Sequence, residues 1–207
     1  MDQTLINDVA RAVHLLGMAL GFGVAFIADL LAARAMVRPL KDHELRMLHS
    51  FHKVVSFGLL LLWTSGLVLL WLRTGFQSEN FSPKLMTKIG VVLLLTANAI
   101  AIGRIGLPTM YAYQSWRFGD LPLSIRLQMS SLATISAACW FSALSLGVFT
   151  QLRPLPWETL SLLVGVTYMV ALAAALAAAT VSPIVAYFAR WRESRPRLFR
   201  ELPQYHT

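Results

Sequence analysis

The sequence predicts an all-α integral membrane protein, a single bundle of five transmembrane helices, from three observations. Hydrophobic residues make up 57% of the 207 residues and charged residues only 14%, whereas soluble domains carry about 25% charged residues. Five apolar stretches are long enough to cross a membrane, which requires about 20 residues. The single cysteine, Cys139, excludes a disulfide scaffold and any cysteine-built zinc or iron–sulfur site.

Each predicted span is bounded by residues that favour loops. The spans are residues 9–33, 52–72, 85–107, 127–149 and 157–186. The connections contain helix breakers, namely Pro39, residues 75–83, residues 108–122 and residues 153–156. No strand-like alternation or repeat interrupts this pattern. We therefore expect one transmembrane domain at residues 1–189, followed by a basic cytoplasmic tail at residues 190–207.

Lysine and arginine are distributed unevenly between the two sides of this bundle. Thirteen of the 18 lie in the first and third loops and the tail, and five lie on the other side. Because cytoplasmic loops are enriched in these residues, we expect the N-terminus outside and the C-terminus inside. The net charge of +8 then indicates contact with anionic lipid headgroups rather than binding of nucleic acid.

Ionisable residues inside spans are costly, so each is a candidate for a functional site. In the outer half of the bundle, His14 on the first span and Lys88 on the third are expected at similar depth. Gly17, Met18 and Gly21 share the helix face of His14. This face suits a flat macrocycle bound through His14, or a second helix packed closely on the glycines. Lys88 could instead extend to the outer headgroups.

A second polar layer is expected near the cytoplasmic end of the spans. Its members are Asp29, His49, His52, Lys53 and Arg104, with Asn98 deeper in the third span. An ion pair from Asp29 to Arg104, or to His52 or Lys53, would neutralise the buried charge and hold helices together. A proton path or a metal site made of Asp29, His49 and His52 is the alternative.

The two layers are too far apart to share one cofactor. At a rise of about 1.5 Å per residue, His14 and the histidines at 49 and 52 are separated by roughly 25 Å. This disfavours a bis-histidine haem within one chain. Serine and alanine in the last two spans favour close helix packing, within the chain, in a homo-oligomer or against a larger membrane complex.

Several short motifs follow one another along residues 10–150. They are VHLLG at residues 13–17 with Gly21 and Gly23, ELRML at 44–48, SGL at 65–67, KLMTK at 84–88, and Arg104 with Leu107 and Pro108. Their order resembles a group of small bacterial membrane proteins that includes the HemJ-type protoporphyrinogen oxidases and the CopD-like copper-resistance membrane domain. The HemJ-type resemblance implies haem b with a first-helix histidine and a third-helix lysine, which are His14 and Lys88.

The leading hypothesis is therefore a multi-pass protein of the bacterial inner membrane that binds haem b at an outer-side site. His14 would be the ligand of the haem iron, with Gly17, Met18, Gly21 and Lys88 around it, and the activity would be that of an oxidoreductase. One alternative is the handling of copper or a small solute along the inner layer of Asp29, His52 and Arg104. The other is a non-catalytic accessory subunit of a larger complex.

Overall fold

The structure is a computed structural model that describes residues 2–194. Throughout this range the regular elements are helical, and five helices are long and apolar enough to cross a membrane, which confirms the predicted class. They are α1 (Gln3–Ala33), α2 (Asp42–Thr74), α3 (Pro83–Ala101) with its continuation η3 (Ile102–Gly106) and α4 (Leu107–Ala112), α5 (Leu123–Val148) and α6 (Trp157–Ser194).

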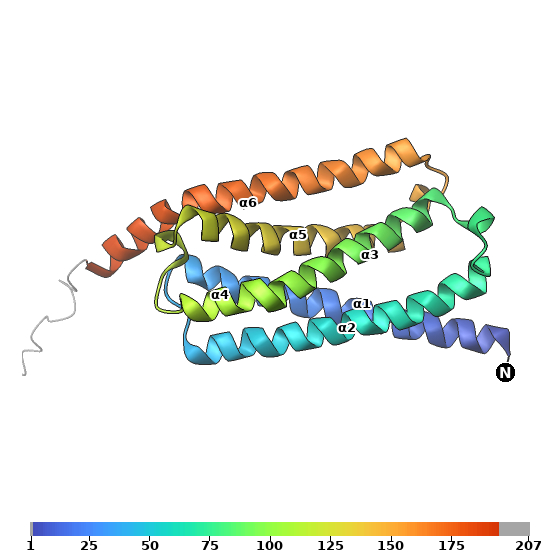
Figure 1. Ribbon diagram of the computed structural model, residues 1–207, viewed down its shortest axis with the longest axis horizontal. Helices are drawn as coiled ribbons and strands as arrows, with labels where there is room; N and C mark the ends of the chain where they lie inside the picture. Colours follow the sequence, from blue (N-terminus) through green and yellow to red (C-terminus); the bar gives the residue numbers. More distant parts are fainter. Residues whose placement is uncertain (1, 195–207) are drawn as a thin grey trace, which may run out of the picture.

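The helices run along the long axis of an elongated bundle (Figure 1). α1 packs mainly on α2, α5 packs mainly on α6, and α3 packs on α5. The N-terminus and the α2–α3 and α5–α6 connections lie at one end, called the N-terminal end. The α1–α2 and α4–α5 connections and the last turns of α6 lie at the other, called the C-terminal end (Figure 1).

Large apolar side chains cover much of the outer surface of the bundle. Leu15, Leu162 and Met169 are each more than 65% exposed, whereas Leu95 and Trp140 are buried in the core. A soluble monomer rarely exposes so much contiguous apolar surface. The helices satisfy their own backbone hydrogen bonds, as a lipid surrounding requires. The protein is therefore a multi-pass membrane protein.

Buried Glu44 joins the start of α2 to the α1–α2 connection through hydrogen bonds and ion pairs. Its side chain is 3% exposed and accepts hydrogen bonds from Arg38 at 2.6 and 2.8 Å, from Arg34 at 3.2 Å and from the N–H of Lys41 at 2.9 Å. The hydrogen bonds to Glu44 raise the pKa of the Arg38 guanidinium. A carboxylate also stabilises the positive end of a helix. α2 consequently begins at Asp42, well before the predicted span.

Pro108 does not end the third membrane-spanning segment, so the breaker predicted there is wrong. The five residues of η3 form a π-helical turn, and Pro108 occupies the first turn of α4 directly after it. Proline lacks the N–H of a regular α-helical hydrogen bond, and the π-helical turn directly before Pro108 moves the hydrogen bonds of this segment to a wider spacing. The segment continues to Ala112, and the α4–α5 connection is correspondingly shorter than predicted.

α6 passes through Pro183 without a break because α5 supplies the missing donor. Proline has no N–H for the carbonyl of Ala179, four residues earlier. Nη1 of Arg126 donates to that carbonyl at 2.8 Å. α6 therefore continues to Ser194 rather than ending near residue 186. Residues 190–194 of the predicted tail belong to this helix, and residues 195–207 lie outside the described residues.

Candidate functional site

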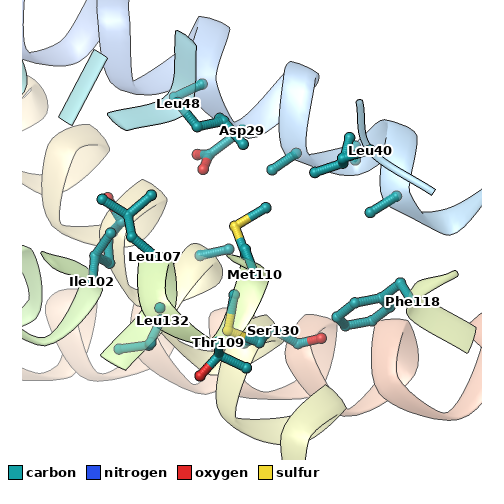
Figure 2. A pocket seen from close by; sticks show the side chains of 18 of the residues that line it. Asp29, Leu40, Leu48, Ile102, Leu107, Thr109, Met110, Phe118, Ser130 and Leu132 are labelled. Atoms are coloured by element: carbon teal, nitrogen blue, oxygen red, sulfur yellow. The ribbon is translucent and has the colours of Figure 1, made fainter. Parts of the chain in front are cut away.

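A cavity of about 310 Å³ lies between the helices at the C-terminal end of the bundle (Figure 2). Four of the elements that line it contribute its main polar and apolar side chains. α1 contributes Asp29, α2 contributes His52, α4 contributes Leu107 and Met110, and α5 contributes Ser130. Most of the wall is apolar, which is typical of a pocket for a small molecule whose few polar groups fix its orientation.

Asp29 is the carboxylate of this cavity. Its side chain points from α1 into the space that Leu107 and Met110 border from the opposite side (Figure 2). Within residues 2–194, the side chain of Asp29 makes no hydrogen bond and no ion pair. Ala25 and Ala32 lie on the same face of α1 and also line the cavity. Their small side chains leave the space into which the carboxylate extends.

His52 reaches the cavity wall beside Gly103 of the π-helical turn, where the absence of a side chain leaves room for its ring. Its ring lies against Gly103, where a Cβ atom would be only 2.7 Å from Nε2. A larger residue at position 103 would therefore displace the imidazole. π-Helical turns occur frequently at functional sites. The turn and the glycine together set the position of the second ionisable group of the cavity.

The structure does not form the predicted ion pair between Asp29 and Arg104. Arg104 lies within the π-helical turn and is exposed, as is Lys53 on α2. The wide turn changes the direction of the side chains relative to a regular α-helix. The depth of Arg104 in the span was therefore not enough to predict which way its side chain points. Asn98 donates to the carbonyl of Leu132 at 3.0 Å, and it joins α3 to α5 instead of contacting Asp29. Of the predicted inner network, Asp29 and His52 alone share the cavity.

The predicted metal site of Asp29, His49 and His52 is not formed. The part of the chain that the structure describes contains no group of three or more His, Cys, Asp or Glu side chains that could hold a metal ion. His49 is exposed on α2, one turn before His52. It lies outside the cavity wall that His52 joins.

His14 joins α1 to α2. Its Nδ1 lies 3.0 Å from the hydroxyl oxygen of Ser65. Because that hydroxyl donates to the carbonyl of Leu61, it acts as the acceptor for His14, which assigns the proton to Nδ1. The ring lies beside Gly66, and Lys88 lies within electrostatic range of it. His14 and Lys88 therefore lie in the same half of the bundle, near the N-terminal end, but no hydrogen bond joins them among the described residues.

The helix face of His14 is filled by protein rather than open. A Cβ at Gly17 would be 2.9 Å from the carbonyl oxygen of Gly58, and one at Gly21 would overlap the indole of Trp140. Met18 packs against the core. The sequence left two uses open for this face, the binding of a macrocycle or close packing against a second helix. In the structure the face packs closely against α2 and Trp140. The surroundings do not fit a macrocycle lying on these glycines, and we assign no step to haem.

No protein-family model, curated protein or solved structure matches this chain. The resemblance to the HemJ-type and CopD-like proteins stays a prediction from short motifs. A function for this protein is therefore inferred from the arrangement of its described residues.

Proposed function

We propose that this membrane protein binds a small, mostly apolar molecule with a cationic or hydrogen-bond-donating group in the Asp29 cavity. The observation that carries the proposal is a carboxylate that has no partner among residues 2–194 and lines an apolar cavity at membrane depth. An ionised carboxylate is costly in apolar surroundings unless it is paired. A ligand that donates to Asp29 would remove this cost, and it would bind more tightly for that reason.

The wall of the cavity indicates the rest of the ligand. Leu107 and Met110 form an apolar surface opposite Asp29, and methionine adapts its shape to different apolar partners. His52 offers a second polar contact, as donor or acceptor. This arrangement favours an apolar body with one polar end, and the carboxylate disfavours an anion. It corresponds to the handling of a small solute, the alternative predicted from the inner layer.

The matched test uses three probes that differ only in their polar group. We expect cyclohexylmethylamine to raise the Tm of the purified protein more than cyclohexylmethanol, and cyclohexanecarboxylate to leave it unchanged. At a ligand concentration of 100 times Kd, binding stabilises the folded state by about 2.7 kcal/mol. Asp29→Asn should remove the preference for the amine over the alcohol. Thermal unfolding in one detergent at constant pH measures all three shifts.

Asp8→Asn is the control for this test, because Asp8 is an exposed carboxylate on the same helix. It should keep the preference for the amine. Equal shifts with all three probes, or an unchanged preference in Asp29→Asn, would contradict the proposal.

The orientation of the bundle decides from which side the cavity is reached. From the uneven distribution of Lys and Arg along the sequence we infer that the cavity lies in the cytoplasmic half. We expect green fluorescent protein fused after residue 207 to fluoresce and alkaline phosphatase at the same position to be inactive. A phosphatase insertion in the α2–α3 connection should be active. Activity of the C-terminal phosphatase would reverse the orientation.

A further inference from the structure

Four cations gather at the N-terminal end of the bundle, away from the Asp29 cavity. Arg73 lies in the last turn of α2, Lys84 and Lys88 lie in the first turns of α3, and Arg153 lies in the α5–α6 connection. The α2–α3 and α5–α6 connections lie at this same end of the bundle (Figure 1), and Lys84 joins α3 to the end of α5. The positive charges of Lys84, Arg73 and Arg153 repel that of Lys88. These residues are called the four-cation cluster. Their mutual repulsion is unfavourable unless a negative charge offsets it.

The described residues supply little of that negative charge. Lys84 is buried and donates to the carbonyl of Phe149, near the end of α5. Lys88, Arg73 and Arg153 make no side-chain hydrogen bond or ion pair with any residue between 2 and 194. Three of the four charges therefore have no acceptor in the part of the chain that the structure describes.

The helix that carries the two lysines makes the electrostatic energy of the cluster more unfavourable. α3 begins at Pro83, and its first turn contains no acidic residue. The N-terminus of a helix bears a partial positive charge, so it stabilises anions and disfavours cations. Cations from two further segments converge on this positive end. An anion in this place would interact with the helix end and with the unpaired side chains at once.

We infer that the four-cation cluster binds a phosphate group at the membrane boundary. The phosphate could belong to the headgroup of an anionic lipid or to a soluble phosphate compound. Phosphate suits the site because its oxygens accept from several cations at the same time. Lys88 reaches the group from one turn deeper in the span than Lys84, while Arg73 and Arg153 are exposed beside it. The proposal concerns a second site and does not depend on the Asp29 cavity.

Delipidated protein in a neutral detergent tests the inference. Phosphatidylglycerol, phosphatidylcholine and sodium phosphate are added separately, the salt against sodium chloride of equal ionic strength. Native mass spectrometry measures lipid binding, and thermal unfolding measures the effect of phosphate. We expect phosphatidylglycerol or phosphate to bind the wild type, and phosphatidylcholine and chloride to bind less. Preference for phosphatidylglycerol identifies a lipid headgroup, and a shift with phosphate identifies a soluble compound.

Charge-removing variants decide whether the cluster is responsible. Lys88→Met and Arg153→Met should each weaken binding about fivefold, since one cation near an anionic lipid contributes about 1 kcal/mol. Lys88→Arg should keep the affinity. Arg11→Met removes an exposed cation of α1 outside the cluster and should change nothing. Unchanged binding in both methionine variants, or equal binding of phosphatidylglycerol, phosphatidylcholine and chloride, would overturn the inference.

Discussion

Replacing Gly21 by leucine should prevent native packing of the bundle, whereas the same change at Gly23 should leave the bundle intact. A Cβ at Gly21 would overlap the indole of Trp140, which is 1% exposed and packed in the core. α2 also approaches closely, since a Cβ at Gly58 would be 2.8 Å from the backbone nitrogen of Gly21. Adding even single methylenes to such a core costs about 1–3 kcal/mol, and leucine adds several.

The measurement is the yield of monodisperse protein, followed by thermal unfolding in the same detergent. Gly21→Leu should lose most of the folded protein, and Gly21→Ala should lower the Tm. Gly23 is the matched control, because no neighbouring atom of the described residues lies within 4 Å of a Cβ at that position. Combining Gly21→Ala with Trp140→Phe should recover part of the loss, since a smaller ring gives the new methyl group space. Equal yields of Gly21→Leu and Gly23→Leu would contradict the assigned packing.

Removing Arg126 should destabilise the protein strongly in the presence of Pro183 and less in its absence. In Arg126→Met the carbonyl of Ala179, a residue that is fully buried, loses its donor. An unsatisfied buried acceptor costs about 1–3 kcal/mol. Pro183→Ala restores an N–H that can bond to this carbonyl within the helix. The cost of Arg126→Met should therefore fall by about 1 kcal/mol in the Pro183→Ala background.

A double-mutant cycle of unfolding free energies measures this coupling between α5 and α6. Arg190→Met is the control, because Arg190 forms an exposed ion pair with Asp120 at 2.8 Å and such pairs contribute about 0–1 kcal/mol. Its cost should be the same with proline or alanine at position 183. If Arg126→Met costs as much in both backgrounds, Arg126 does not replace the missing N–H.

Composition predicted the spans well but their ends poorly. A run of apolar residues locates the part of a helix that lies in lipid, and all five such parts are present. The polar turns beyond them follow other rules. α2 starts early through a hydrogen-bonded cluster around Glu44, and α6 passes Pro183 through a donor on another helix. Both depend on a contact between separate segments, which hydropathy does not describe.

The predicted sites show the same division. Spacing correctly put His14, Gly17 and Gly21 on one face of α1, but it could not tell which partner that face contacts. Depth also put Asp29 and His52 in one layer, and both line the cavity. It failed for Arg104, because the π-helical turn changes the direction in which that side chain leaves the helix. The alanines beside Asp29 were the available signal for a cavity in that layer.

The sequence by itself determined that the chain forms five apolar helices and which polar residues lie at membrane depth. Both properties follow from the cost of placing polar groups in lipid, which each segment meets independently. Only the tertiary structure decided that Trp140 and Gly58 occupy the glycine face of α1. It also decided that the side chain of Asp29 faces a cavity and has no partner among the described residues. Such contacts join residues that are distant in the chain, and lipid is as apolar as their side chains. Which residues come into contact therefore depends on the shape of the helix surfaces and on the direction in which each helix face points. Both are set only when the helices pack together.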